Sequence, residues 1–196
     1  MKTKTVQSIT VGDFYSRHKD ELELSLLGDD SGFSQLIREP APNRPGLALA
    51  GFFTYFAKKR VQVLGNSELS YLKKLDDKTR AKRFEAFCAQ KIPCLVLARN
   101  FTLPDELVKT AHEANIAIFN SPMVTMKMLN LATHCLESDF APTTTVHGVM
   151  VDYRGIGILI MGKSGAGKSE TAIGLLEKGA ALVADDMVYI LSLIHI

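Results

Sequence analysis

The sequence lacks the long apolar run that a membrane helix needs. None of its 196 residues lies in a segment that approaches the roughly 20 consecutive apolar residues of such a helix. No apolar stretch follows the lysines near the start of the chain, as it would in a secretion signal. We therefore expect a protein that is not exported, has no membrane partner and works in the cytoplasm.

A large excess of charge is also missing. The chain has 23 Lys and Arg against 21 Asp and Glu, which leaves a formal net charge of +2. This charge is too small, and too evenly spread, to indicate nucleic-acid binding. With 46% apolar and 22% charged residues, the composition is that of a globular protein, so disorder and fibres are excluded. The length suits one large domain or two small ones.

Cysteine is scarce, with three residues at well-separated positions, Cys88, Cys94 and Cys135. Their odd number and wide spacing exclude a disulfide framework and a CxxC metal site, and favour reduced thiols. The histidines show no metal-ligand spacing with one another or with the cysteines. These histidines are His18, His112 and His134. We therefore expect no metal site other than that of a nucleotide-bound Mg²⁺.

The first part of the chain alternates strand-like and helical patterns. Short apolar runs typical of buried parallel strands occupy residues 61–64, 94–98 and 116–119. Helices are predicted between and after them, with Ser67 and Asp77 as N-caps of the first two. Two further helices are expected, at about residues 104–114 and 124–136. The pattern predicts an α/β sandwich domain over residues 1–136.

A second domain is predicted to start after a polar linker at residues 137–145. Two strand-like runs follow, 146–153 and 156–161, and the turn Arg154-Gly155 between them predicts a hairpin. The second domain, with its linker, is predicted to span residues 137–190. The last six residues, 191–196, read LSLIHI, which one frame of a sequencing-library adapter would encode. We interpret them as a non-native tail.

One motif carries a specific chemical signal. The eight residues after the hairpin fit the pattern G-x-x-x-x-G-K-[ST], with a strand before and a helix after. They are Gly162, Lys163, Ser164, Gly165, Ala166, Gly167, Lys168 and Ser169. The glycines let successive backbone N–H groups converge on a phosphate, and the helix adds its positive end. Lys168 suits the β- and γ-phosphates, and the Ser169 hydroxyl suits Mg²⁺. A magnesium-bound nucleotide is the predicted ligand.

Two carboxylates follow one helix and one strand later. The helix runs from Ser169 to Lys178, and the apolar strand 180–184 ends in Asp185-Asp186. Ligands of open α/β sheets lie at the carboxyl ends of strands, so we expect both carboxylates close to the phosphate loop. There they would hold Mg²⁺ or accept the proton of an attacking hydroxyl, and spacing does not decide which residue is the base. His147 precedes the hairpin and is a weaker candidate.

Residues His147 to Asp186 resemble the HPr kinase/phosphorylase family. The shared features are His147-Gly148, the hairpin, the loop, Glu170-Thr171-Ala172 and Ala184-Asp185-Asp186. The first part agrees through Arg44-Pro45-Gly46-Leu47, Gly51-Phe52-Phe53, residues 60–65 and Glu68, so the resemblance covers about residues 40–190. At Lys163 relatives often carry an acidic or small residue, and the family's later active-site elements are absent.

The resemblance implies an N-terminal α/β domain followed by a PEP-carboxykinase-like kinase domain. It implies an enzyme that uses ATP or pyrophosphate with Mg²⁺ to phosphorylate a serine of the carrier protein HPr, and that removes the phosphate by phosphorolysis. By this resemblance His147, Lys168, Asp185 and Asp186 are catalytic, and the protein forms homo-oligomers, in the family hexamers. We expect the present chain to be inactive.

Two other functions fit the loop. One is a different P-loop kinase that phosphorylates small molecules. Incubation with labelled ATP and a panel of sugars, compared with HPr, would identify it. The other is a regulatory module that senses a nucleotide without transferring phosphate. Arg44, Arg60 and Glu68 of the first domain border strands and turns, and ion pairs explain them at least as well as ligand contacts.

Overall fold

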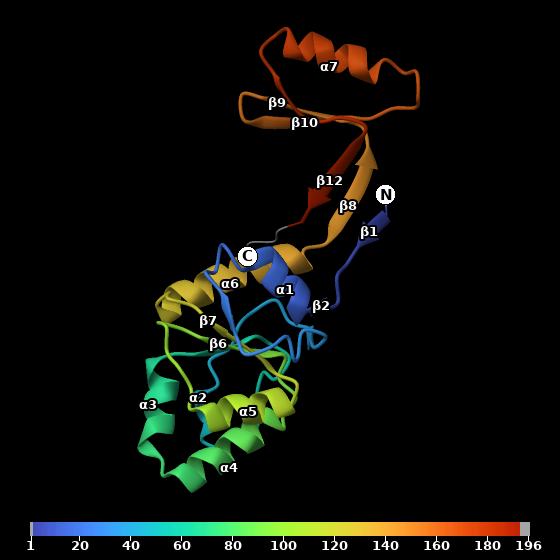
Figure 1. Ribbon diagram of the computed structural model, residues 1–196. Helices are drawn as coiled ribbons and strands as arrows, with labels where there is room; N and C mark the ends of the chain where they lie inside the picture. Colours follow the sequence, from blue (N-terminus) through green and yellow to red (C-terminus); the bar gives the residue numbers. More distant parts are fainter. Residues whose placement is uncertain (1, 193–196) are drawn as a thin grey trace. The chain divides into compact units, whose positions relative to one another are not determined.

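The computed structural model of the protein describes residues 2–192 (Figure 1). The chain forms a mixed α/β structure with several sheets and divides into two compact units. The first unit is Val6–Phe140, and the second combines Met1–Thr5 with Ala141–Ile196. Of the expected non-native tail, Leu191 ends the last strand, whereas residues 193–196 lie outside the described residues.

A four-stranded sheet in the order β3-β7-β6-β5 forms the centre of the first unit. The strands β5 (Gln62–Leu64), β6 (Cys94–Leu97) and β7 (Ala117–Asn120) are parallel, and β3 (Ser25–Leu27) adds an antiparallel edge. All residues of β5, β6 and β7 are buried. The prediction of buried parallel strands is therefore confirmed. Such strands are apolar along their length because helices cover both faces of the sheet.

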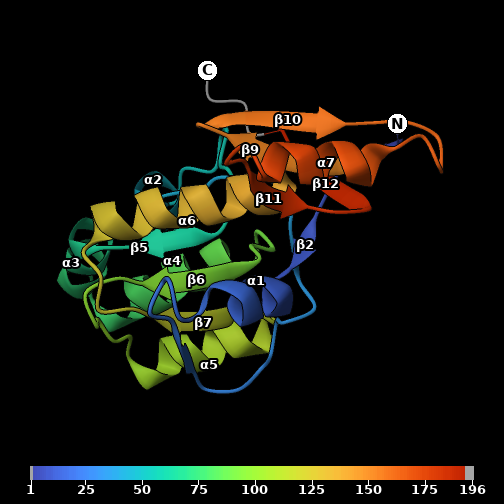
Figure 2. The same ribbon diagram turned by 90° about the horizontal axis from the view of Figure 1, so that it is seen from above.

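Helices cover the two faces of this sheet with two separate cores. One face packs against α1 (Val11–His18) and α6 (Thr125–Phe140). The other packs against α3 (Asn66–Lys74), α4 (Asp77–Cys88) and α5 (Asp105–Glu113). Figure 1 shows α1 and α6 above β6 and β7, with α4 and α5 below them, and Figure 2 shows β5, β6 and β7 side by side. Alternate strand residues enter alternate cores, as the two-residue period of a strand requires.

Two helix starts and one helix end differ from the sequence expectation. The N-cap of α3 is Gly65 instead of Ser67, and Glu68 Oε2 accepts a hydrogen bond from the Gly65 N–H at 3.0 Å. The N-cap of α4 is Asp76, one residue before the expected Asp77, and its carboxylate accepts from the Thr79 N–H. The helix expected to end at residue 136 continues to Phe140 because Leu136 and Phe140 still pack on the core.

The remaining elements of the first unit are short. The strands β2 (Ile9–Thr10) and β4 (Leu36–Ile37) pair with each other, and α2 (Gly46–Leu49) forms a single turn before β5. Thr10 also caps α1, since its hydroxyl oxygen accepts a hydrogen bond from the Asp13 N–H at 3.0 Å.

The second unit contains two three-stranded antiparallel sheets. One has the order β1-β8-β12, formed by β1 (Lys2–Lys4), β8 (Thr143–His147) and β12 (Met187–Leu191). The other has the order β10-β9-β11, formed by β9 (Val149–Tyr153), β10 (Ile156–Ile160) and β11 (Ala181–Ala184). The expected linker 137–145 thus contains the end of α6 and the start of β8, with Ala141 and Pro142 between them.

The predicted hairpin is confirmed with one change. Tyr153 pairs with Ile156 across the turn Arg154-Gly155, but the first run is interrupted at Gly148, so His147 belongs to β8 and to the other sheet. The helix α7 (Lys168–Leu176) contacts β9, β10 and β11 and covers them in Figure 1. Val149, Val151 and Ala172 form the buried core between helix and sheet.

Candidate functional site

The glycines of the 162–169 loop adopt a backbone that other residues avoid. Gly165 and Gly167 have φ of +78° and +81°, in the left-handed region where a Cβ is unfavourable. A Cβ added to Gly162 would lie 3.3 Å from the Ala166 Cβ, so that position is also tight. The Ala166 N–H donates to the Lys163 carbonyl at 3.2 Å and closes a turn. The loop is held by its own backbone and leaves its concave side open.

Lys168 is the first residue of α7, and its side chain folds back over the loop. Its Nζ donates to the carbonyl oxygens of Gly162 at 3.0 Å and of Lys163 at 3.1 Å. An ammonium group has three N–H donors, so one remains for an anionic ligand. The first turn of α7 is anchored by Thr171, whose N–H and hydroxyl both donate to the Gly167 carbonyl. A positive charge and a helix N-terminus therefore meet beside the loop.

Asp185 and Asp186 lie at the same sheet edge as the loop, for a different reason from the one expected. The sheet is not an open parallel one here: β10 and β11 do not pair with each other but each pairs antiparallel with β9. The strands β10 and β11 consequently run in the same direction on either side of β9. Ile160 at the end of β10 is opposite Val149, and Ala184 at the end of β11 is opposite Met150. The segments that follow both strands emerge together.

A hollow of about 420 Å³ joins these features. Its walls include five residues of the loop motif and both aspartates. The lining residues are Gly148, Val149, Ser164, Gly165, Gly167, Lys168, Ser169, Glu170, Asp185 and Asp186. Gly162, Lys163, Ala166 and His147 do not line it. The hydroxyl and carboxylate oxygens at its walls are the donors that Mg²⁺ prefers, so the residues present fit a magnesium-bound phosphate.

His147 is connected to the site by a contact with Asp186 and does not line the hollow beside the loop. Its Nδ1 lies 3.4 Å from Asp186 Oδ1, and both side chains are exposed, at 74% and 86%. Asp186 has φ of +65°, its N–H donates to Asp185 Oδ1 at 2.9 Å, and its carbonyl accepts from the Gly148 N–H at 3.1 Å. This turn fixes the aspartate pair at the end of β11.

Three lining residues, Gly148, Val149 and Glu170, were not singled out as site residues from the sequence. Glu170 occupies the first turn of α7, where acidic residues are common for reasons of helix stability alone. Gly148 allows β9 to begin close to the end of β10, because an added Cβ would lie 2.6 Å from the Ile160 carbonyl oxygen. In the sequence, Gly148 is recognisable only as a glycine inside a strand-like run. Such a glycine is typical of any bend and does not indicate a site.

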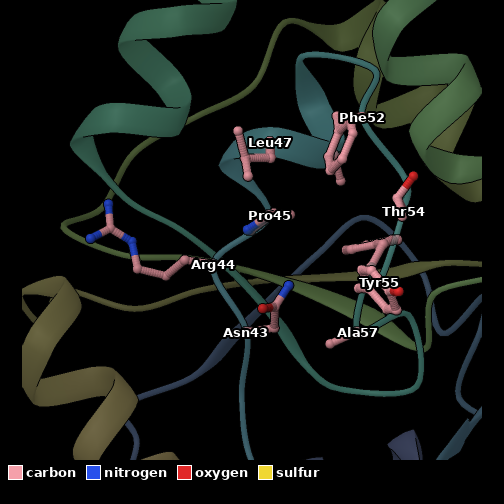
Figure 3. Close-up of a pocket in the computed structure, with 10 residues that line it drawn as sticks. Asn43, Arg44, Pro45, Leu47, Phe52, Thr54, Tyr55 and Ala57 are labelled. Atoms are coloured by element: carbon pink, nitrogen blue, oxygen red, sulfur yellow. The ribbon is translucent and has the colours of Figure 1, made fainter.

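The first unit has a smaller hollow, of about 150 Å³, lined by α2 and by the segments just before and after it (Figure 3). Leu47, Phe52 and Tyr55 border it, and Figure 3 shows the Arg44 side chain directed away from them. Arg44 instead donates two hydrogen bonds to the Glu68 carboxylate, at 3.2 and 3.0 Å. Arg60 pairs with Glu39, so the polar residues noted in the sequence form ion pairs. Ligand pockets are typically 300 Å³ or larger, and this hollow is below that size.

Across residues 2–192, no helix combines the length and apolar character required to cross a membrane. The three cysteines are free and buried. Burial raises the pKa of Cys88 to about 12, with a smaller contribution from the charge of Glu85. Burial likewise raises the pKa of Cys135 to about 12, assisted by Glu21 and Asp139. Both thiols are therefore protonated near neutral pH.

Comparison with known protein families covers almost the whole chain. Residues 9–136 match the HPr Serine kinase N terminus, and residues 138–195 match the HPr Serine kinase C-terminal domain. The chain belongs to the HPr serine kinase family.

Relatives of this family member carry the name HPr kinase/phosphorylase. The protein from Bacillus licheniformis is 42% identical over 171 residues, which are 87% of this chain and 55% of that protein. The protein from Bacillus subtilis is 41% identical over 177 residues, or 89% of this chain and 57% of that protein. The chain thus spans about half the length of the curated relatives it matches.

A solved structure of the CBS and DRTGG domains of a Clostridium perfringens pyrophosphatase matches 64% of this chain and 48% of that chain. Its TM-score is 0.47 and its sequence identity 11%, too low to establish a common fold.

Proposed function

We propose that the protein is an HPr serine kinase/phosphorylase that binds ATP or pyrophosphate with Mg²⁺ in the hollow beside the 162–169 loop. The observation that supports this proposal most strongly is the convergence of three features on one hollow: the glycine-bounded loop, the N-terminus of α7 with Lys168, and the pair Asp185-Asp186. The names of the relatives favour HPr as substrate over the small-molecule kinase and the nucleotide sensor.

The chain's own residues divide the work of phosphoryl transfer as follows. Backbone N–H groups of residues 162–169 hold the phosphates, and Lys168 places its charge on the transferred group. One carboxylate of Asp185-Asp186 accepts the proton of the attacking serine hydroxyl while the new O–P bond forms and the bond to the leaving ADP oxygen breaks. Bound Mg²⁺, held through Ser169 and a carboxylate, would neutralise charge on the phosphates.

The reverse reaction uses the same groups. Inorganic phosphate attacks the phosphoserine, the bond between phosphorus and the serine oxygen breaks, and pyrophosphate leaves. The aspartate that accepted the proton returns it to the serine oxygen. His147 Nδ1 lies 3.4 Å from Asp186 Oδ1, so its role in this scheme is to orient that carboxylate.

The proposal extends to organisation and setting. Residues 1–136 form an N-terminal α/β sandwich domain, and residues 137–190 form the linker and start of a PEP-carboxykinase-like kinase domain. The protein acts in the cytoplasm on carbon metabolism and assembles into homo-oligomers, hexamers by family resemblance.

Phosphorylation of HPr by a protein extended to the length of the relatives tests the function. Asp185→Asn and Asp186→Asn are compared with Glu177→Asn, a carboxylate at the far end of α7. We expect at least one aspartate variant to lose about 100-fold or more of the rate at saturating ATP, and the Glu177 variant to retain it. Full activity in both aspartate variants would refute the assigned roles.

Two experiments, one with different acceptors and one with a variant of Lys168, separate the proposed enzyme from a small-molecule kinase and from a nucleotide sensor. A panel of sugars offered with labelled ATP would become phosphorylated if the protein were a small-molecule kinase, and HPr would not. Lys168→Ala abolishes phosphoryl transfer if the protein is an enzyme of the proposed kind. A nucleotide sensor would show no transfer in either form, and its partner binding would not depend on that substitution.

A further inference from the structure

Three side chains of types that bind metals lie close together in the first unit. None of them takes part in the proposed phosphate chemistry. One ring nitrogen of His18, one carboxylate oxygen of Glu21 and the Cys135 sulfur all lie within 4.8 Å of one another. His18 ends α1, Glu21 lies in the turn that follows, and Cys135 lies on α6. The sequence predicted no such site because His18 and Cys135 are far apart along the chain; packing of α1 against α6 brings them together.

The donor types indicate which cation these residues suit. Mg²⁺ and Ca²⁺ select oxygen ligands and leave thiolates unbound, whereas zinc and related transition metals bind thiolate, imidazole and carboxylate together. Ligand atoms around a four-coordinate zinc ion at about 2.0–2.3 Å lie roughly 3.5 Å apart. The separations here require only small side-chain movements to reach that geometry. We propose that His18, Glu21 and Cys135 form a binding site for Zn²⁺ or a cation of the same class.

The surroundings of His18 support this site. Asp139 Oδ2 lies 2.8 Å from His18 Nε2, and Arg17 donates to the other oxygen of Asp139 at 2.9 Å. Because Asp139 occupies Nε2, we assign Nδ1 as the nitrogen that binds the cation. A carboxylate that holds the second nitrogen of a metal-bound histidine in this way fixes the ring and raises its basicity. Asp139 is therefore a positioning residue, and Arg17 balances its charge.

Burial places the site at the edge of the core, with access from one side. Cys135 is buried, His18 is half-buried, and Glu21 is exposed. Glu21 thus marks the solvent side of the site and Cys135 the inner side, and three protein ligands leave one position of a tetrahedral ion for water. The Cys135 thiol loses its proton to solvent as the sulfur–metal bond forms, so binding strengthens with rising pH. The bound ion ties α1 to α6 within the first unit.

Cobalt absorption spectroscopy on the tag-free, metal-free 196-residue protein tests the site. Co²⁺ replaces Zn²⁺ in such sites, and a thiolate bound to it gives a charge-transfer band in the near ultraviolet. We expect this band to saturate at one equivalent of Co²⁺ and to disappear when Zn²⁺ is added. The hollow beside the 162–169 loop contains no thiol, so Co²⁺ bound there gives no such band.

Matched variants assign the ligands. Cys135→Ala removes the band, whereas Cys88→Ala, a buried cysteine in the other core, retains it. His18→Gln weakens Co²⁺ binding at least about tenfold and His134→Gln, an exposed histidine on α6, does not. Asp139→Asn weakens it by about 10 to 100-fold.

Glu21→Gln provides a variant at an exposed position that leaves the core unchanged, in case Cys135→Ala does not fold. We expect it to weaken Co²⁺ binding at least about tenfold. Absence of the band in the folded wild-type protein would overturn the proposal and leave these residues as a hydrogen-bonded contact between α1 and α6. A band that persists in folded Cys135→Ala would overturn it as well.

Discussion

Replacing Gly167 by alanine separates the cost of loop strain from the loss of phosphate binding. Gly167 precedes α7 with φ of 81° and ψ of 20°. Alanine in this left-handed region costs about 1–2 kcal/mol. The nearest atom to an added Cβ is Glu170 Oε2 at 3.8 Å, which is ordinary contact, so no steric clash contributes. The effect of the substitution is therefore one of backbone conformation.

The strain appears in one of two places. If the loop keeps its conformation, the free energy of unfolding of the second unit falls by about 1–2 kcal/mol. If the loop relaxes to negative φ, its N–H groups turn away from the phosphates. Each lost hydrogen bond to a charged group costs about 1.5–3 kcal/mol, which corresponds to a roughly 10 to 150-fold weaker affinity. We expect relaxation, because the loop is exposed and no packed side chain holds it in place.

Gly155→Ala is the matched control. Gly155 also has φ of +81° and has no atom within 4 Å of an added Cβ, but it lies in the turn of the β9–β10 hairpin. Pyrophosphate affinity is measured by calorimetry with Mg²⁺ present, and stability by thermal unfolding. Gly167→Ala should weaken pyrophosphate binding at least about tenfold while Gly155→Ala binds normally. Equal affinities in the two variants would refute the assignment of the loop as a phosphate cradle.

Two further predictions concern stability of the first unit. Because burial raises the pKa of Cys88 to about 12, above its usual value of 9.0, the folded state holds this proton more tightly than the unfolded state. Cys88 should therefore contribute a fall of about 1.4 kcal/mol per pH unit to the free energy of unfolding between pH 9 and 12, and the slope should become shallower by that amount in Cys88→Ala; equal slopes in urea titrations would contradict it. Glu68 is 4% exposed and accepts hydrogen bonds from Arg44 and Gly65. Glu68→Gln should therefore lower the free energy of unfolding by about 2 kcal/mol. Glu39→Gln, which breaks the half-exposed pair with Arg60, should cost less than about 1 kcal/mol, and a similar loss in both would contradict the difference in burial.

The parts of the fold that could be predicted from sequence are those set by local patterns. The runs that became β5, β6 and β7 are rich in Val, Ile and Leu with polar segments on either side, and burial on both faces leaves few other structures for them. The turn Arg154-Gly155 and the loop 162–169 depend on glycines at fixed spacing, which local chemistry determines.

The parts that could not be predicted depend on partners distant in sequence. Lys2–Lys4 pairs with β8, although its lysines show no apolar strand pattern. The position of β9 between β10 and β11 follows from antiparallel pairing on both of its sides, which no single segment reveals. Gly65 became the N-cap of α3 because Glu68 reaches back to its N–H, a contact that also depends on Arg44. Local propensity does not carry such information.

A calorimetric titration of the 196-residue protein with ATP, in the presence and absence of Mg²⁺, tests the central claim most directly. Within residues 2–192, the Lys168 ammonium donates hydrogen bonds only to the exposed carbonyls of Gly162 and Lys163, so Lys168→Ala should fold with stability within about 0.5 kcal/mol of the wild type. We expect one ATP bound per chain only when Mg²⁺ is present, with affinity at least about tenfold lower in Lys168→Ala. Absence of ATP binding by the folded protein, or binding unchanged by removal of Mg²⁺ and of the Lys168 side chain, would contradict it.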